Sequence, residues 1–366
     1  MESCCIEQFL EGKTIFITGG ATGYLSKILT EKILRVQPNV KKMYLLIRAP
    51  DSNSAKQRFN NEVIKTNLFG VLREKLGANL HSFIEDSYPS CRGYSLYDTA
   101  IRTNVLGAMN VLKFSKQCSK LMMLLHVSTA YVCGEKEGLI LEKPLNYGEM
   151  LNGSSHLDIN VEQKLVEEAR KELRDRNATE KEVRLAMRVL GIERARQHGW
   201  PNTYSFTKSM GEMLLGHLKE DLQLIIILRP TIILSTYKEP FPGWIEGMKT
   251  ADTFIVGYGK GKQKLAMGGR ETITDVVYDM VVNSVIAAMV AHRNASSCVA
   301  VYHISSSRRN QIKLGDFIRI GVDYFKKNPW IEERGKPVKV KKFHLLNSLH
   351  KYIAIHYMPS LKVRFA

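Results

Sequence analysis

Residues Lys13–Leu25 read KTIFITGGATGYL, and this stretch decides the fold. Lys13–Thr18 is a short β-branched run between glycines, which is typical of a buried parallel strand. The next segment, Leu25–Val36, has apolar residues at helical spacing and is closed by Pro38. A strand, a glycine turn and a helix in this order bind dinucleotides, because glycines let the backbone approach a pyrophosphate at the helix N-terminus. The candidate cofactor-binding residues here are Thr18, Gly19, Gly20, Thr22, Gly23, Tyr24 and Leu25.

Strands and helices are expected to alternate along the rest of the chain. This alternation predicts an α/β fold, a Rossmann-like doubly wound parallel sheet. Further strands are expected at Lys42–Ile47, Leu121–Ser128, Leu222–Leu228 and Val299–Ser305. Helices are expected at Ser54–Leu76, Tyr97–Gln117, Asn160–Arg196, which splits in two near Asn177–Thr179, and Thr203–Leu218.

The chain has 366 residues, of which 44% are hydrophobic and 24% charged, as in an ordinary globular protein. Its net charge of +17 raises nucleic acid, an anionic membrane or a polyanionic substrate as partners. No basic block interleaved with aromatics is present, so nucleic acid ranks last. Most of the charge is expected to come from scattered, solvated lysines and arginines. Binding of a phosphate-rich cofactor or substrate explains part of the rest.

Six cysteines without CxxC or metal-ligand spacing indicate free thiols in a reducing compartment. The N-terminus MESCCIEQFLEGK lacks the apolar core of a signal peptide, and the runs LMMLLHV and LQLIIILRPTIIL are too short or interrupted to span a bilayer. We therefore expect a cytoplasmic protein, and a peripheral contact with the endoplasmic reticulum surface is left open.

Arg48 follows the second expected strand, where an NAD enzyme usually presents a carboxylate to the ribose hydroxyls. An arginine there suits the 2′-phosphate of NADPH, through charge-assisted hydrogen bonds. The competing interpretation is an exposed arginine, with nearby Asp51 binding the ribose. The first interpretation predicts NADPH as the cofactor.

Tyr204 and Lys208 lie four residues apart in PNTYSFTKSMGEMLL, so they share one face of the expected helix. A neighbouring ammonium stabilises a phenolate, whose pKa is otherwise near 10. The pair can therefore supply a general acid at neutral pH, as carbonyl reduction requires. The spacing alone is common on helix surfaces.

The chain resembles the short-chain dehydrogenase/reductase superfamily and, within it, the plant alcohol-forming fatty acyl-CoA reductases. The matching runs include the stretch from KTIFITGG to LLIRAP, TNVLGAMNVLKFSKQC, LLHVSTAYVCGE, HGWPNTYSFTKSMGEML and RPTIILSTYKEPFPGWIEGMKT. The likeness covers most of residues 10–310, and PFPGWIEG and HGWPNTY are its most specific parts. It implies reduction of a long-chain acyl-CoA by NADPH to an aldehyde and then, with a second NADPH, to a fatty alcohol.

The resemblance also implies roles for individual residues. Tyr204 would protonate the developing oxyanion, and Lys208 would tune it and hold the nicotinamide ribose. Thr129, in VSTAY, would polarise the carbonyl, and Ser128 is the less favoured choice. Either hydroxyl can instead be a strand-end group that bonds to local backbone.

Other residues near these positions have competing interpretations. Asn104 stands where related enzymes keep a relay asparagine, although an asparagine inside a helix is otherwise usually on the surface. Tyr97 and Asp98 match the family's YD, with helix capping as the alternative. Cys133 is favoured as an inert buried thiol over a nucleophile, since no activating histidine is evident. His126 is expected to be a satisfied core histidine.

The chain departs from the family pattern in three places. The glycine loop has one residue more than usual between Thr18 and its last glycine. A third strand, a helix and a fourth strand need about 30 residues, but only Gly77–Leu96 is available. This strand–helix–strand unit is expected to be deleted. The deletion would leave a gap beside the first strand, Thr14–Thr18. Alternatively, the first strand would pair directly with Leu121–Ser128, which would displace Thr129 from the cofactor. The C-terminal region is expected to be truncated.

We therefore expect an NADP-binding reductase domain at 10–310, with an interleaved substrate region and helical insert, followed by a short C-terminal substrate part at 311–366. The leading hypothesis is membership of the acyl-CoA reductase family, with activity in question because of the deletion. A second is a catalytically inactive relative or gene-model remnant. A third is an NADP-dependent reductase of another carbonyl substrate, which PFPGWIEG and the charged insert disfavour.

Overall fold

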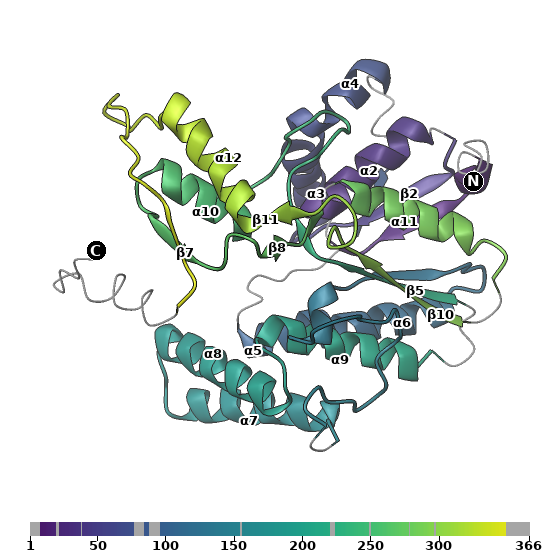
Figure 1. The fold of residues 1–366 in the computed structure, drawn as a ribbon. Helices are drawn as coiled ribbons and strands as arrows, with labels where there is room; N and C mark the ends of the chain where they lie inside the picture. Colours follow the sequence, from purple (N-terminus) through teal and green to yellow (C-terminus); the bar gives the residue numbers. More distant parts are fainter. Residues whose placement is uncertain are drawn as a thin grey trace. The chain divides into compact units, whose positions relative to one another are not determined.

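The computed structural model describes residues 8–19, 22–37, 39–76, 84–87, 96–153, 156–219, 224–248, 250–277, 279–295 and 298–348 (Figure 1). The chain divides into two compact units. The first comprises residues 1–231, 236–244 and 279–304, and the second comprises 232–235, 245–278 and 305–366. All candidate site residues belong to the first unit, and Gly20 alone lies outside the described residues.

The first unit contains two parallel sheets of three described strands each. One has the order β1 (Thr14–Ile17), β2 (Lys42–Leu46), β3 (Ile84–Ser87), and the other the order β10 (Cys298–Ile304), β5 (Leu224–Pro230), β4 (Leu124–Val127). This confirms the predicted parallel, Rossmann-like class. Every residue of β5 is buried, as its continuous apolar run predicts.

The strand β3 corrects one expectation. We expected the third strand of the first sheet to be deleted, but Ile84–Ser87 pairs with β2, so that strand is present. No helix and fourth strand follow β3 among the described residues, where the chain continues at Leu96. The missing part is therefore shorter than a full strand–helix–strand unit.

The alternative pairing of β1 with β4 is also not adopted. In the described part of the chain, β1 pairs with β2 alone and β4 with β5 alone, so both are edge strands. An aromatic contact joins the two sheets instead. The rings of Phe16 in β1 and Phe114 in α6 lie edge to face with centroids 5.5 Å apart, and both side chains stay more than a third exposed.

Helices cover both faces of the second sheet (Figure 1). On one side lie α9 (Thr203–His217) and a continuous helical run made of α5 (Tyr97–Ala100), a π-helical segment (Ile101–Leu106) and α6 (Gly107–Gln117). On the other lies α11 (Met280–Ala291). Leu112 of α6 and Leu215 of α9 pack with β5 in one buried cluster.

The predicted single helix at Ser54–Leu76 is wrong. It is broken into α3 (Ser52–Phe59), a π turn (Asn60–Ile64), a 3₁₀ turn (Asn67–Phe69) and α4 (Gly70–Leu76). The buried residues include the adjacent pairs Val63–Ile64 and Leu68–Phe69, which one face of a straight helix cannot bury together. The guanidinium of Arg73 bonds to carbonyls freed by the break.

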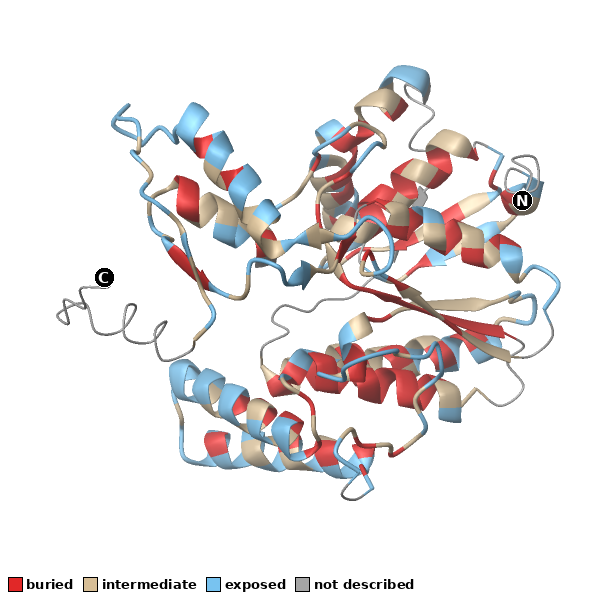
Figure 2. Cartoon of the chain, in the orientation of Figure 1, coloured by how far each residue is buried: buried red, intermediate tan, exposed pale blue. Residues whose placement is uncertain are grey.

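The charged insert forms two helices, α7 (Ile159–Asp175) and α8 (Glu180–Gln197), split where the sequence predicts. Asn177 takes a left-handed conformation with φ of 52°, and Thr179 forms a capping box with Glu182. Figure 2 shows one buried stripe on each of these helices and exposed residues elsewhere.

In its described residues, the second unit is built from short strands and two helices. The strands pair as β6 (Ile232–Ile233) with β9 (Val276–Val277), β8 (Ile273–Thr274) with β11 (Ile312–Lys313), and β7 (Leu265–Met267) with β12 (His344–Leu346). The helices are α10 (Thr250–Gly259) and α12 (Leu314–Lys327). Within the described residues of either unit, no helix combines the length and apolarity needed to cross a bilayer.

A close approach of two helix backbones suggests a stability test. A Cβ on Gly211 of α9 would lie 2.3 Å from the carbonyl oxygen of Asn104, whereas one on Gly216 of the same helix has its nearest neighbour at 3.9 Å. Gly211→Ala should therefore lower the free energy of unfolding by about 1–3 kcal/mol, and Gly216→Ala should leave it unchanged or raise it slightly. Urea denaturation of both variants measures this, and equal effects would refute the packing argument.

Candidate active site

The glycine turn leaves the N-terminus of α2 (Tyr24–Val36) open to an anion. Its N-cap is Gly23, which offers no side-chain cap, and the first turn has no acidic residue. The first N–H groups of the helix therefore have no capping side chain. At the other end of the turn, a Cβ on Gly19 would lie 3.1 Å from the hydroxyl of Ser26, so a larger residue would crowd the turn. These features fit a bound pyrophosphate.

Thr18, Thr22 and Leu25 are partly buried around this turn, as are Gly23 and Tyr24. The turn follows β1, while Thr129 follows β4 of the other sheet. The cofactor-binding and catalytic candidates thus come from two sheets that share no described strand pairing.

Arg48 and Asp51 differ in how their side chains are used. Asp51 caps α3, since its carboxylate accepts hydrogen bonds of 2.8 Å from both the N–H and the hydroxyl of Ser54. These bonds lower the pKa of Asp51. Arg48 is partly buried just beyond the end of β2. The carboxylate that competes with Arg48 for the ribose is therefore already engaged.

Tyr204 and Lys208 lie one turn apart on α9. The helix is capped by Asn202, whose side chain accepts the N–H of Ser205 at 2.9 Å. Tyr204 is 37% exposed at the first turn. Lys208 is partly buried, and its Nζ donates to the carbonyl of Val127, the last residue of β4, at 2.9 Å. The lysine thus ties α9 to the carboxyl end of β4, next to Ser128 and Thr129.

Burial changes the ionisation of two groups on this face. It lowers the pKa of Lys208 to about 8, against the attraction of the Glu212 carboxylate. Burial, with the charge of Lys208, lowers the pKa of His126 to about 3, so this imidazole is neutral. The Nε2 of His126 is buried without a hydrogen-bond partner, so the histidine is not fully satisfied as we expected.

Ser128 and Thr129 are both buried, but they differ in hydrogen bonding. The Thr129 hydroxyl is 3.5 Å from the carbonyl of Pro230 and 3.4 Å from the N–H of Tyr131, at the start of the 3₁₀ turn Ala130–Cys133. Both bonds are near the upper limit of length, which leaves this hydroxyl weakly held. The Ser128 hydroxyl is buried without a partner.

Asn104 lies in the π-helical segment and is buried rather than on the surface. Its Nδ2 donates to the hydroxyl of Thr207 at 2.9 Å, on the residue before Lys208. Single π turns inside α-helices often occur at functional sites. The Nδ2 bond to Thr207 holds Asn104 against α9, the helix that carries Tyr204 and Lys208.

A buried ion pair fixes α9 to β5. Arg229 Nη2 lies 2.7 Å from the carboxylate of Glu212, and both side chains are at most 1% exposed. The same guanidinium is 3.2 Å from Nε2 of His303 in β10 and 3.8 Å from Sγ of Cys133. Burial raises the pKa of Cys133, which supports its interpretation as an inert thiol.

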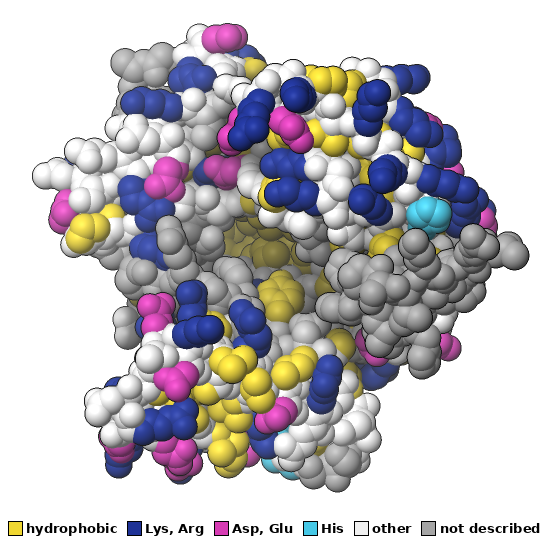
Figure 3. Space-filling model, turned by 90° about the vertical axis from the view of Figure 1, so that its left-hand side faces the viewer, with side chains coloured by type: hydrophobic (Ala, Val, Ile, Leu, Met, Phe, Trp, Pro, Cys, Tyr) yellow, Lys and Arg dark blue, Asp and Glu magenta, His cyan; other side chains and the backbone are white. Residues whose placement is uncertain are grey.

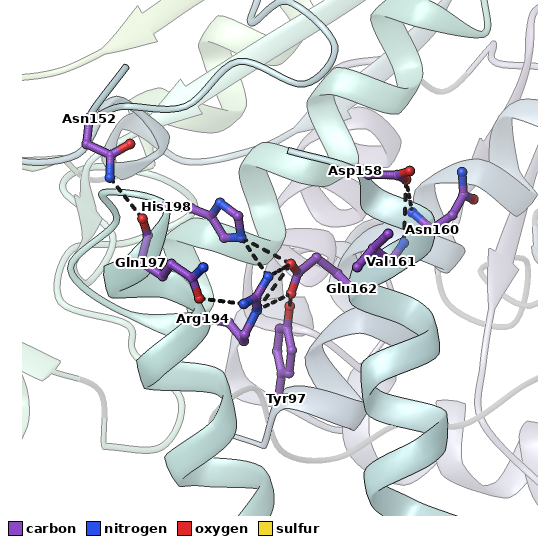
Figure 4. Close-up of polar contacts among 9 residues, drawn as sticks. All are labelled: Tyr97, Asn152, Asp158, Asn160, Val161, Glu162, Arg194, Gln197 and His198. Carbon is purple, nitrogen blue, oxygen red and sulfur yellow. Dashed lines mark hydrogen bonds and ion pairs between the residues drawn. The ribbon is translucent and has the colours of Figure 1, made fainter. Parts of the chain in front are cut away.

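Sequence reasoning missed a second buried network, which anchors the helical insert (Figure 4). The carboxylate of Glu162 in α7 accepts hydrogen bonds from the Tyr97 hydroxyl at 2.5 Å and Arg194 Nε at 3.0 Å, and lies 3.1 Å from His198 Nε2. Although burial opposes it, these bonds lower the pKa of Glu162 to about 2. Tyr97 is thus an anchor of the insert. Nothing in the charged sequence of α7 sets Glu162 apart from its neighbours.

The network also reaches α9, the helix that carries Tyr204 and Lys208. The His198 ring stacks on Phe206 of α9 with centroids 5.2 Å apart, and Trp200 Nε1 donates to the carbonyl of Val132 at 2.9 Å. Asp98, the other member of the YD pair, forms an ion pair with Arg170 of α7. The run HGWPNTY therefore joins the insert to the segment after Thr129.

Two solved structures of low sequence identity share this fold. The terminal reductase domain of the myxalamid pathway is similar with a TM-score of 0.57 and 13% identity, over 94% of this chain and 74% of that one. A reductase domain of a nonribosomal peptide synthetase from Mycobacterium tuberculosis gives 0.55 and 15%, over 96% and 79%. At this identity the likeness shows the fold class alone, a Rossmann-like fold.

The sequence itself shows the family. Residues 17–87 and 90–285 match the NAD-binding profile described as male sterility protein. The chain is 46% identical to the alcohol-forming fatty acyl-CoA reductase of Simmondsia chinensis, over 98% of this chain and 80% of that protein. It is 44% identical to fatty acyl-CoA reductase 1 of Arabidopsis thaliana, over 99% and 81%. The chain belongs to this fatty acyl-CoA reductase family, and its cofactor is a nicotinamide dinucleotide.

The comparisons also bear on the missing segment. The alignment with the Simmondsia protein runs over 397 positions, although this chain has only 366 residues, so that protein has residues without a counterpart here. The profile match is interrupted between 87 and 90, directly after β3. The alignment with fatty acyl-CoA reductase 7 of A. thaliana runs over only 366 positions and covers 99% of this chain.

The desolvated ammonium of Lys208 makes the free energy of unfolding depend on pH. An unfolded lysine keeps its proton up to about pH 10.4, whereas folded Lys208 loses it near pH 8. Between these values the unfolded state binds more protons, so stability should rise with pH, and below pH 8 the buried ammonium costs about 3 kcal/mol.

Lys208→Met should therefore be more stable than the wild type at pH 7, and the difference should shrink between pH 8 and 10. Urea unfolding at pH 7, 8, 9 and 10 measures it. Lys171→Met, at an exposed position of α7, should give a curve parallel to that of the wild type. A parallel curve for Lys208→Met would show that its ammonium is not desolvated.

Proposed function

We propose that this chain reduces a long-chain fatty acyl-CoA with one NADPH to an aldehyde, releasing coenzyme A as the free thiol, and then with a second NADPH to the fatty alcohol. The observation that carries the proposal is the position of Lys208, one turn after Tyr204 on α9 and bonded to the carbonyl that directly precedes Ser128 and Thr129. The family supports the substrate, because relatives at 42–46% identity over most of this chain are named fatty acyl-CoA reductases.

The residues present fit this chemistry. The nicotinamide cofactor supplies the hydride. The Tyr204 hydroxyl donates a proton to the carbonyl oxygen as negative charge develops on it, and the ammonium of Lys208 favours the resulting phenolate. The weakly held Thr129 hydroxyl can turn toward that oxygen, and the orphaned Ser128 hydroxyl lies beside it in sequence. Asn104 holds the helix turn that carries Lys208 through Thr207.

We propose NADPH rather than NADH because of the residues that follow β2. The carboxylate of Asp51 is hydrogen-bonded at the N-terminus of α3, whereas Arg48 can pair with a 2′-phosphate. Basic side chains spread over the face in Figure 3 agree with anionic ligands such as acyl-CoA and NADPH.

The same charge suggests where the chain works. We place it in the cytoplasm at the surface of the endoplasmic reticulum, because the net charge of +17 favours anionic membranes and the substrate is amphiphilic. Apolar side chains, including Leu185 and Val189 of α8, are exposed on the helical insert, which lies low in Figure 3. Fractionation of cells expressing the chain tests this placement.

A second candidate, a catalytically inactive relative, is favoured by one observation. Among the described residues, the cofactor turn and the catalytic hydroxyls follow strands of separate sheets, with no fourth strand between them. In a complete doubly wound sheet that strand lies beside the first and supports the cofactor.

Expression in yeast separates the two candidates. The active enzyme should produce new primary fatty alcohols, and Tyr204→Phe should lower their formation by about 100-fold or more, because the general acid is lost. Lipid extraction and gas chromatography measure the alcohols. Tyr324→Phe, at an exposed position of α12, is the matched control. A folded wild-type chain that makes no alcohol would establish the inactive relative.

Cofactor choice has its own test. Arg48→Asp should weaken NADPH binding by about tenfold or more and bring it close to that of NADH, because a carboxylate repels the 2′-phosphate. Fluorescence titration with both cofactors measures this. Lys56→Asp makes the same kind of charge change at an exposed position of α3 and should keep the preference. An unchanged preference in Arg48→Asp would refute the role of Arg48.

A further inference from the structure

The run PFPGWIEG is the most family-specific part of the sequence, and the proposed chemistry gives it no role. Its first residues belong to the loop Thr236–Trp244, which we call the clamp loop. The clamp loop belongs to the first unit although the chain on either side of it belongs to the second. What it contacts there is the helix that follows the glycine turn.

Thr236 closes the clamp loop on itself. Its N–H donates to the carbonyl of Trp244 at 2.9 Å, and its hydroxyl accepts the N–H of Trp244 at 2.8 Å and donates to the carbonyl of Phe241 at 2.7 Å. Gly243 donates to the carbonyl of Thr236 at 2.8 Å and has φ of 81°, which favours glycine. The loop is thus a rigid body held by its two ends.

Charged groups attach the clamp loop to the C-terminal half of α2. The carboxylate of Glu239 lies 2.5 Å from both Lys32 Nζ and Arg35 Nη2. Asp279, at the start of α11, accepts the backbone N–H groups of Tyr237 and Glu239 at 2.9 Å. Phe241 and Trp244 add apolar contacts to the core cluster around α2.

At the N-terminal end of α2 the attachment is aromatic. The rings of Trp244 and Tyr24 are stacked with centroids 5.2 Å apart and planes 3° from parallel, and the Tyr24 hydroxyl donates to the carbonyl of Trp244 at 3.3 Å. Trp244 is 9% exposed. Tyr24 is the first residue of α2 and follows Gly23 directly. The contact therefore falls on the helix turn whose N–H groups have no capping side chain.

We propose that Trp244 is a positioning residue for the nicotinamide dinucleotide. By stacking on Tyr24 it fixes the first turn of α2, and with it the end of the glycine turn, in the arrangement that binds the pyrophosphate. This turn has no side-chain cap and its N-cap is a glycine, so it is not held by local capping bonds. The clamp loop supplies that restraint from a distant part of the sequence. The inference deepens the proposed function, since it concerns the cofactor of the same site.

Calorimetric binding to three probes tests the proposal without requiring turnover. NADPH and 2′-phospho-ADP-ribose contain the pyrophosphate, whereas adenosine 2′-phosphate lacks it. Trp244→Ala should raise the Kd of the first two by about tenfold and leave that of the third unchanged. A merely structural role would weaken all three probes alike or none. In an active enzyme the KM for NADPH should rise, with kcat at saturating NADPH unchanged.

Variants at three positions sharpen the test. Tyr24→Ala should reproduce the effect of Trp244→Ala, and the double variant should add little to either single change, because both remove the same contact. Tyr237→Ala removes an exposed aromatic side chain from the same loop and should bind all three probes as the wild type does. Unchanged pyrophosphate affinity in Trp244→Ala, at a melting temperature equal to that of Tyr237→Ala, would overturn the proposal.

Should Trp244→Ala fail to fold, Tyr24→Leu carries the test, because it keeps an apolar side chain and removes the stacked ring. The same selective loss is expected, and its absence would overturn the proposal. A wild-type chain that binds NADPH but reduces no acyl-CoA would contradict the proposed function alone. A wild-type chain that binds none of the probes would contradict the inference.

Discussion

The position of the candidate active site depends on the buried ion pair between Glu212 and Arg229. It lies between α9 and β5, at most 1% exposed, and its guanidinium also reaches His303 of β10. Two charges in such a place are stable only when each satisfies the other, so the pair fixes the helix at one height along the sheet. Lys208, one turn before Glu212, is thereby carried to the end of β4, where it bonds to Val127. Glu212 lies in SMGEML, so the run that directly follows Lys208 carries the group that positions it.

Sequence patterns predicted the parts of the fold that short-range chemistry determines. The first strand, glycine turn and helix, the split of the insert at Asn177–Thr179 and the buried strand β5 all follow from propensity, caps and hydrophobic runs. Sequence patterns did not predict local structure that depends on contacts with residues distant in the chain. The π turn at Asn104 depends on the backbone approach at Gly211, and the break in the predicted helix at Ser54–Leu76 depends on the burial of adjacent apolar pairs. No periodicity within one segment encodes either constraint.

Sequence patterns likewise predicted some residues of the candidate site and missed others. Tyr204, Lys208, Thr129 and Asn104 were named from motif positions, and the structure connects Lys208 and Asn104 to neighbouring residues of α9 and β4. Their roles stay predictions. The anchoring carboxylate of Glu162 and the stack of Trp244 on Tyr24 were not found, because each joins residues far apart in the chain. In both cases the only signal was a family-specific run, HGWPNTY or PFPGWIEG, whose purpose becomes visible once its partner is known.

The aromatic contact between Phe16 and Phe114 has a consequence for how this chain can associate with other chains. Phe16 belongs to β1, and in the described residues β1 and β4 each present an unpaired edge. Open edges of apolar strands are templates for pairing with other chains, and one exposed ring pair shields them poorly. Within the described residues, the edges of β1 and β4 are therefore the places where a strand from another molecule could add to this chain.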